Sequence, residues 1–398
     1  MSPELIEIDV ARELVLARAT RGPAEQVAIE AALGRVLAEE IASADDVPGF
    51  DNSAMDGYAV RAADTPGRIR VVGESRAGAP FDREVEPGEA IRISTGAMLP
   101  GGADAVVRVE DTDGGSDAVE VRTGVEAGRD IRRAAEDIAA GEVVLVPGAE
   151  LGPAELGVLA SVGIAEVVCA RRPRVTVLTT GDELQEPGEP LRPGGIRNSN
   201  LHSVSALVRR AGAELAGAEI VRDTEPETRA ALERGLESDI TVVCGGVSVG
   251  EHDHVRPALE ALGVEQVFWG VSLRPGKPTY FGVAPSGCLV FGLPGNPVSA
   301  MVTFVLFVRP AIRKIVGARD DAERSMAALD SEYPRLAART QAVRCRLELR
   351  DDGWHAEPTK AQGSHVLTSM LGADALAIIP PGDGPQPAGA RIEIELLP

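Results

Sequence analysis

The stretch RVTVLTTGDEL, residues 174–184, begins an alternation of strands and helices that decides the fold of this chain. The apolar runs ITVVCGG (240–246) and CLVFGLP (288–294) continue it, and helical patterns such as LHSVSALVRRAG (201–212) lie between the runs. Continuously apolar strands that alternate with helices are typical of a parallel sheet covered on both faces. Residues 173–319 are therefore predicted to form a doubly wound α/β domain.

The regions on either side of this domain have a different pattern. Helical apolar spacing is found in residues 8–21 and again in residues 31–41. Residues 47–146 contain short β-like runs separated by Pro-Gly and Gly-Gly turns, which predicts a small barrel or sandwich. The segment 151–164 has a proline near its start and a glycine near its end, which favours a short helix between domains. Short strands return after residue 320, so a small β-domain is predicted to close the chain.

The composition is strongly acidic. The 61 Asp and Glu side chains exceed the 40 Lys and Arg side chains, so the formal net charge is −21. This balance argues against a nucleic-acid binder, because phosphate backbones are held by an excess of Lys and Arg. Any anionic substrate must instead meet a local positive site, such as a few basic side chains, a helix N-terminus or a bound cation. The four cysteines lack CxxC spacing and are predicted to be buried structural thiols.

Neither a membrane segment nor an export signal is indicated. The most apolar helical stretch, 298–308, is too short to span a bilayer and is stopped by Arg309 and Pro310. The N-terminal residues carry acidic side chains early and lack the basic start, apolar core and cleavage site of a signal peptide. We therefore expect a cytoplasmic protein without a membrane partner.

Acidic side chains follow three of the predicted strands at the point where each strand ends. Glu183 lies in the loop after the first strand, Asp223 ends the next one, and Asp253 follows ITVVCGG. Ligands of an open parallel sheet bind outside the carboxyl ends of its strands, so these loops are predicted to meet at one edge. Carboxylate oxygens suit a hard cation such as Mg²⁺, whereas His252 and His254 lack a third ligand for zinc. Turn and helix-cap roles account for single carboxylates here as well.

Two glycine-rich loops share this predicted edge. CGGVSVGEHD offers the backbone amides of Gly245 and Gly246 and the hydroxyl of Ser248, although its spacing is neither a Rossmann fingerprint nor a P-loop. GLPGNPVSA places Asn296 and Ser299 at the start of an apolar helix. Its amides and hydroxyl are suited to an anion, and a well-capped buried helix explains the pattern equally well.

Basic and small polar residues complete the candidate site. RPGKP (274–278) holds Arg274 and Lys277 in a rigid turn, which favours binding of an oxyanion over a solvated surface. In the β-rich part, DNSAMDGYAV and ISTGAMLPGGADAVV contain more small polar residues than strands require. Turn chemistry explains their glycines but does not explain Asp56 or Thr95.

Taken in order, these segments resemble the molybdopterin molybdenumtransferase family, MoeA, whose relatives include the C-terminal domain of gephyrin. Eight motifs appear in the family's order, and together they cover essentially the whole chain: DNSAMDGYAV, STGAMLPGGADAVV, GRDIR, LTTGDEL, RNSN, CGGVSVGEHD, RPGKP and GLPGNPVSA. The resemblance implies an elongated homodimer of four-domain subunits. The implied domains are a split extended linker (1–43 and 142–172), an inserted β-domain (44–141), an α/β domain like that of the adenylyltransferase MogA (173–319) and a C-terminal β-barrel-like domain (320–398).

The resemblance also implies a reaction, in which molybdate is inserted into adenylylated molybdopterin with Mg²⁺-dependent release of AMP to give molybdenum cofactor. The residues implied for catalysis are Asp56, Thr95, Glu183, Asp223, Asp253 and Lys277, of which Glu183, Asp223 and Asp253 are the implied Mg²⁺ ligands. The residues implied for substrate binding are Asp130, Gly245, Gly246, Ser248, Arg274, Pro294, Asn296 and Ser299. The partner subunit would supply Asp56 and Thr95, so that the active site is shared. Family members often have Lys at the position of Arg274, so this chain keeps the charge but not a Lys-specific role.

Two other functions fit part of the pattern. The adenylyltransferase of the preceding step shares the α/β domain, but the additional β-domains and AMDGYA favour the later step. A noncatalytic molybdopterin carrier or scaffold, as in the anchoring role of gephyrin, is opposed by the lack of a long linker or recognition tail. The protein partners implied are a second copy of the chain, the adenylyltransferase and apo-molybdoenzymes.

Overall fold

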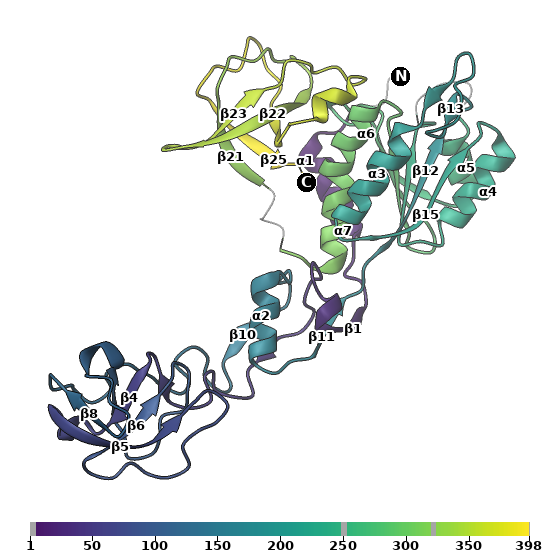
Figure 1. Ribbon diagram of the computed structural model, residues 1–398. Coiled ribbons are helices and arrows are strands. Elements are labelled where there is room, and N and C mark those ends of the chain that lie inside the picture. Colours follow the sequence, from purple (N-terminus) through teal and green to yellow (C-terminus); the bar gives the residue numbers. More distant parts are fainter. Residues whose placement is uncertain (1–4, 248–252, 320–323, 398) are drawn as a thin grey trace.

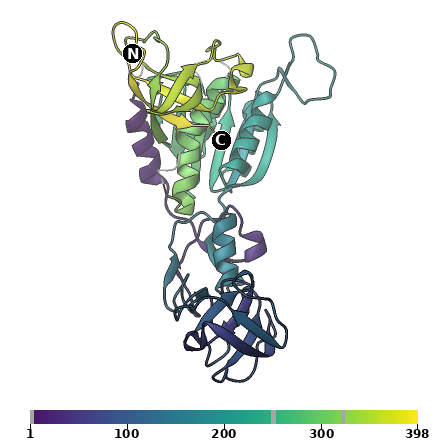
Figure 2. The same cartoon turned by 60° about the vertical axis from the view of Figure 1, so that its left-hand side comes forward.

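The computed structural model of the chain describes residues 5–247, 253–319 and 324–397. Figures 1 and 2 show an elongated molecule, with a β-domain at one end and a narrow linker in the middle. An α/β domain and a second β-domain lie side by side at the wider end, where helix α1 (Ile8–Arg18) also packs. Within the described residues, no helix is long and apolar enough to cross a membrane.

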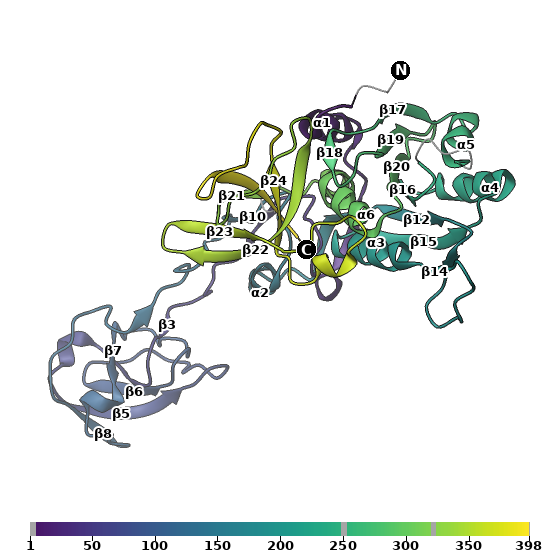
Figure 3. The same ribbon diagram turned by 90° about the horizontal axis from the view of Figure 1, so that it is seen from above.

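The α/β domain is built on a six-stranded sheet with the order β15-β12-β16-β20-β19-β17, which Figure 3 shows from above. The first four strands are parallel, which confirms the predicted doubly wound core. The last two add an antiparallel edge that the sequence does not indicate, because β17 (EQVFW) and β19 (YFGV) are short and, unlike β16 and β20, do not stand in long continuously apolar runs. The bounds are β12 (Arg174–Thr180), β15 (Glu214–Val221), β16 (Ile240–Cys244), β17 (Glu265–Trp269), β19 (Tyr280–Val283) and β20 (Leu289–Leu293).

Helices cover both faces of this sheet, as expected for strands with continuous apolar runs. One apolar cluster joins the sheet to α1, α3 (Ser199–Arg210) and the segment 297–316. A second cluster, on the other face, joins it to α4 (Glu225–Gly235) and α5 (Val255–Ala261). All four cysteines of the chain are buried free thiols, which confirms the sequence prediction.

The segment 297–316 forms one continuous rod from three helical pieces. These are α6 (Pro297–Thr303), a π-helical turn (Phe304–Val308) and α7 (Arg309–Val316). Every side chain of the π-helical turn is buried, so the predicted apolar core helix is confirmed. The irregular turn comes directly before Pro310, which lacks the N–H that a regular α-helical ladder needs.

The linker is formed by two separated stretches of chain. Strand β1 (Ala24–Ala28) pairs with β11 (Glu166–Ala170), and β2 (Ile41–Ala42) pairs with β10 (Val143–Leu145). Helix α2 (Pro153–Ser161) packs beside them, where the sequence predicts a helix.

The helix predicted for residues 31–41 is wrong. Only the 3₁₀ turn Ile29–Ala31 lies near this stretch, and the chain then runs extended, so that Val36 and Leu37 form bridges to Glu150 and Cys169. Gly34 has a φ of 69°, a left-handed conformation that ends the helical turn. The apolar spacing of this stretch therefore serves the linker core, not a helix.

The inserted β-domain carries a five-stranded sheet with the order β7-β4-β6-β5-β8. A short pair, β3 (Asn52–Ser53) with β9 (Ile131–Arg132), lies beside it. Two small apolar clusters fill its two sides. The bounds are β4 (Gly57–Val60), β5 (Gly67–Ser75), β6 (Glu89–Ile93), β7 (Ala105–Arg108) and β8 (Ala118–Val121), with 3₁₀ turns at Ala62–Asp64 and Val109–Asp111.

The C-terminal domain is a closed β-barrel. Its strands follow the order β22-β23-β21-β25-β24, and β24 pairs again with β22 to close the ring. The short strand β18 (Leu273–Arg274) of the α/β domain extends this barrel by pairing with β22. The bounds are β21 (Arg324–Leu329), β22 (Thr340–Arg350), β23 (Gly353–Pro358), β24 (Ala375–Ile379) and β25 (Arg391–Leu396), with a 3₁₀ turn at Leu367–Met370.

One buried carboxylate connects this barrel to the α/β domain. Glu395 on β25 is 1% exposed and accepts hydrogen bonds from three arginines of different elements. Its partners are Arg12 of α1 at 3.2 Å, Arg309 of α7 at 2.7 Å and Arg324 of β21 at 3.1 Å. We name these four side chains the Glu395 cluster. Charge-assisted hydrogen bonds on both oxygens compensate the cost of burying the carboxylate.

Replacement of Glu395 by Gln is expected to lower the free energy of unfolding by about 3–5 kcal/mol, because the buried guanidinium groups would lose their counter-charge. The matched control is Glu393→Gln, since Glu393 pairs with Arg324 at 3.1 Å but is 39% exposed at its side chain. That control should change stability by less than about 1 kcal/mol. Urea unfolding followed by tryptophan fluorescence measures both values, and equal effects would contradict a special role for Glu395.

Candidate active site

Two of the predicted acidic loops meet at the carboxyl edge of the sheet. The N–H of Asp182 donates to Oδ2 of Asp223 at 3.3 Å, and the N–H of Asp223 donates to Oδ1 of Asp182 at 3.2 Å. Glu183 folds back over Gly181, where an added Cβ would lie 2.7 Å from its carboxylate. The loops after β12 and β15 are thus joined, as the strand order predicts.

Asp253 enters the same edge from the loop after β16. Both of its carboxylate oxygens are buried and make no well-formed hydrogen bond in the part of the chain that the structure describes, although the backbone N–H groups of Arg256 and Val255 lie near enough to lower its pKa. Burial raises the pKa of Asp253, and burial also raises the pKa of Asp223, with further contributions from the nearby Asp182 and Glu183 charges. His254 lies close enough to lower the pKa of both carboxyls. Negative charge is therefore concentrated here without full compensation by protein groups.

Mg²⁺ fits these carboxylates as a candidate ligand. The buried oxygens of Asp253 are the donor type that a hard cation prefers. Among the described residues, no three His, Cys, Asp or Glu side chains gather closely enough to hold a metal ion on their own. Mg²⁺ commonly takes one or two carboxylates and completes its octahedron with water and substrate phosphates. The assignment of Asp253, Glu183 and Asp223 as ligands remains a prediction.

Glycines allow the next two loops to pack tightly against this edge. Gly245 and Gly246 have φ values of 94° and 62°, and a Cβ on Gly246 would lie 2.6 Å from Val255. The N–H of Gly245 donates to the carbonyl of Leu293 at 3.0 Å, which joins the loop after β16 to GLPGNP. Ser248, also predicted for this loop, lies outside the described residues.

The GLPGNP loop then leads to the C-terminal domain. Pro294 and Ser299 are buried, and Asn200 of α3 donates to the carbonyl of Gly295 at 2.8 Å. The side chain of Asn296 donates to Oγ of Ser364 at 3.2 Å. The sequence does not indicate this contact, because Ser364 belongs to a loop that carries no motif.

A cationic pocket of about 200 Å³ lies beyond this contact, between the two domains. Arg274 lines it from β18, and Arg344 lines it from β22. Arg344 is only 1% exposed and donates to the carbonyls of Ala361 at 3.3 Å and Gly363 at 3.4 Å. Its Nε has no partner within the described residues, and burial lowers the pKa of the guanidinium. A buried, partly unsatisfied guanidinium is suited to an oxyanion.

Arg344 was not among the residues that sequence reasoning selects. The one signal for it is an arginine inside the otherwise buried first half of β22, residues 340–345. Lys277, three residues after Arg274, is exposed at the end of the same turn. The turn therefore brings Arg274 to the pocket that the unpredicted Arg344 lines, whereas Lys277 is not among the residues that line it.

The remaining predicted residues lie in the inserted β-domain. Oδ1 of Asp56 accepts hydrogen bonds from the N–H and the hydroxyl of Thr95, at 2.7 and 2.9 Å, which hold its pKa below the ordinary value. Both oxygens of Asp130 accept from Arg108 at 2.8 Å, so this carboxylate is engaged within its own domain. Its predicted role in substrate binding is untested. Figure 1 places this domain at the opposite end of the molecule from the α/β sheet, so one chain does not bring Asp56 and Thr95 to Asp253.

Three family models together match nearly the whole chain. Residues 6–163 match the MoeA N-terminal region (domain I and II), and residues 176–314 match a probable molybdopterin binding domain. Residues 326–397 match the MoeA C-terminal region (domain IV). Every folded unit described above thus has a counterpart in these models.

Individual proteins match over similar lengths. Molybdopterin molybdenumtransferase of Haemophilus influenzae is 37% identical over 381 residues, which are 93% of each chain. That of Bacillus subtilis is 35% identical over 98% of this chain and 94% of its own. A crystal structure of the molybdopterin biosynthesis moeA protein from Pyrococcus horikoshii OT3 superposes with a TM-score of 0.83 at 32% identity, covering 99% of this chain and 100% of that one. The chain therefore belongs to the molybdopterin molybdenumtransferase (MoeA) family.

Proposed function

We propose that this protein inserts molybdate into adenylylated molybdopterin and releases AMP, in a cytoplasmic homodimer whose two active sites are shared between the subunits. The observation that carries the proposal is that one row of connected loops has acidic side chains at one end and basic side chains at the other. The buried carboxylate of Asp253 stands at one end of a row of loops, and Arg274 and Arg344 line a pocket at the other end, with the exposed Lys277 in the same turn as Arg274. An adenylylated pterin carries phosphates and molybdate is an oxyanion, so both need such cations in an acidic chain.

The contacts between loops support one continuous substrate surface. The N–H of Gly245 donates a hydrogen bond to the carbonyl of Leu293, and Asn296 donates one to Ser364. Next to Ser364, the carbonyl of Gly363 accepts a hydrogen bond from Arg344. A ligand with a phosphate at the carboxylate end and an oxyanion at the arginine end would extend along this row. When bound at Asp253, Mg²⁺ supplies positive charge beside the phosphate oxygens.

The side chains of the protein act by position and charge in this proposal. Lys277 and Arg274 hold oxyanion oxygens, and Arg344 contributes a buried charge that water screens little. No described side chain at the edge has the paired nucleophile and base of a covalent mechanism. The sulfur ligands of molybdenum therefore belong to the substrate, and the protein orients them.

Lys277→Ala is expected to lower the rate of AMP release by about 100-fold or more, because a charge aimed at the reacting oxyanion is lost. The assay supplies adenylylated molybdopterin, Mg²⁺ and molybdate, and follows AMP and the activation of an apo-molybdoenzyme. Lys314→Ala, at an exposed lysine of α7, is the control and should keep full activity. Adenylylation of free molybdopterin by ATP would indicate the adenylyltransferase instead. If neither activity is detected, the result would favour a noncatalytic carrier.

Asp253→Asn is expected to raise the Tm at neutral pH without divalent cation, because it removes a buried charge that makes no well-formed hydrogen bond. The pKa of Asp253 is raised on folding, so the folded state loses stability as the pH rises from the ordinary carboxyl pKa through the raised one. The difference in Tm should shrink as the pH falls and vanish below the ordinary carboxyl pKa of about 3.9, where the folded and unfolded states both carry the proton. Mg²⁺ should raise the Tm of the wild type and of the exposed-site control Asp117→Asn, but not of Asp253→Asn, in thermal scans. Equal Mg²⁺ responses would remove Asp253 from the cation site.

A mixture of two inactive variants tests the shared site. Asp56→Ala and Lys277→Ala, unfolded together and refolded at equal amounts, should recover about a quarter of wild-type activity, because half the dimers are mixed and each has one intact site. Each variant refolded alone should stay inactive. Failure of the mixture to recover activity, with dimers seen by sedimentation, would place Asp56 outside the partner's site.

A further inference from the structure

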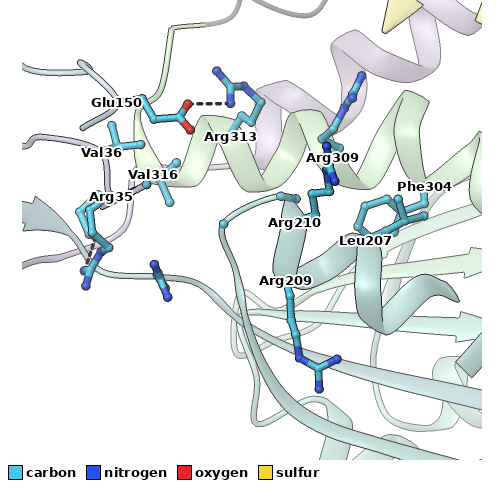
Figure 4. A pocket seen from close by; sticks show the side chains of 15 residues that line it. Arg35, Val36, Glu150, Leu207, Arg209, Arg210, Phe304, Arg309, Arg313 and Val316 are labelled. Atoms are coloured by element: carbon cyan, nitrogen blue, oxygen red, sulfur yellow. Dashed lines mark hydrogen bonds and ion pairs between the residues drawn. The ribbon is translucent and has the colours of Figure 1, made fainter. Parts of the chain in front are cut away.

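A second cationic cavity lies away from the candidate active site. Its volume is about 390 Å³, within the size range of small-molecule sites, and it is enclosed by the linker, the end of α3 and the rod 297–316. Figure 4 shows labelled arginines from these different elements around one hollow. Of the charged side chains that line the cavity, six are arginines and one, Glu150, is a glutamate.

The six arginines divide into three that are paired with carboxylates and three that are not. Arg309 is bound to Glu395 at 2.7 Å, Arg313 lies 3.5 Å from Glu150, and Arg35 pairs with Glu25. In contrast, the guanidinium groups of Arg172, Arg209 and Arg210 bind no carboxylate or carbonyl in the described part of the chain. In a chain of net charge −21, adjacent arginines without counter-charges are unexpected.

A solvated helix end explains only part of this arrangement. Arg209 and Arg210 occupy the last turn of α3, where positive charge interacts favourably with the helix dipole. Arg172 comes from the segment between β11 and β12, and Arg35 comes from the irregular stretch of the linker before β2. The Nε of Arg35 is buried and has no partner among the described residues. Exposed arginines from separate elements thus line one cavity, which points to a ligand.

The cavity is distinct from the active site. Helix α3 begins beside the GLPGNP loop, where Asn200 contacts Gly295, and ends at Arg210. With 12 residues at 1.5 Å each its length is about 18 Å, so Arg210 lies near the opposite edge of the sheet. The rod 297–316 runs in the same sense, from Asn296 at the site to Arg313 and Val316 at the cavity.

We propose that this cavity binds a small phosphate-bearing anion through Arg172, Arg209 and Arg210, with Arg35 at its linker side. Guanidinium groups form charge-assisted, often bidentate hydrogen bonds with phosphate. Three arginines without a carboxylate partner that line one cavity are therefore suited to a phosphate group. The ligand would bridge the linker and the α/β domain. It would therefore fix the direction in which the linker carries the inserted β-domain.

Isothermal titration calorimetry on the full chain, with inorganic pyrophosphate and AMP as separate probes, tests the proposal. The double variant Arg209→Gln/Arg210→Gln should weaken binding by about 100-fold, because each of the two lost charge-assisted hydrogen bonds contributes roughly tenfold. Arg229→Gln on α4, an exposed arginine paired with Glu233, is the matched control and should bind as the wild type. Tighter binding of AMP than of pyrophosphate would show that a nucleoside part contributes.

Lys277→Ala separates this site from the active site. Binding that persists in Lys277→Ala and is lost in the double variant supports the cavity. Binding that is lost in Lys277→Ala and kept in the double variant overturns it, as does the absence of binding by either probe to the wild type. A change of oligomeric state in the double variant without loss of anion binding would assign the arginines to a second copy of the chain, and would also overturn the proposal. No molybdate transfer is measured, so the result does not depend on the proposed reaction.

Discussion

The buried carboxylate of Glu395 is the constraint on which the wider end of the molecule depends. A carboxylate that is 1% exposed needs full compensation, and here it comes from Arg12, Arg309 and Arg324. These residues belong to the first helix, the central rod and the first barrel strand. The cluster therefore holds the barrel against the α/β domain in one orientation. That orientation lets β18 pair with β22, so that Arg274 and Arg344 line the same pocket.

Charge is distributed unevenly in this acidic chain, and the uneven distribution has structural causes. The carboxylates at the sheet edge follow from strand topology, since each lies just beyond the end of a parallel strand. The cations follow from packing between domains, because Arg344 is held by the loop 361–364 of the barrel while Arg274 reaches the same pocket from β18 of the α/β domain. Two kinds of constraint, one within a domain and one between domains, thus place opposite charges along one surface.

The same distinction explains how much could be predicted from the sequence. Local periodicity is enough for β12, β16, β20 and the rod, because each is long or continuously apolar. It fails for residues 31–41, where apolar spacing resembles a helix but Val36 and Leu37 pair with segments more than a hundred residues away. It also fails for Arg344, which is held by a loop of its own domain, and for Ser364, which contacts Asn296 only across the two domains. Motif order identified most of the candidate residues, whereas their distances and partners required the fold.

The pairing of β1 with β11 has a consequence for how the protein is made. The strand Ala24–Ala28 finds its partner only when residues 166–170 have left the ribosome, and α1 finds α7 only after residue 316. The sheet of the inserted β-domain, by contrast, is complete within residues 57–121. During N-to-C synthesis this domain is therefore the first unit able to fold, while the residues before it remain exposed until the later partners emerge.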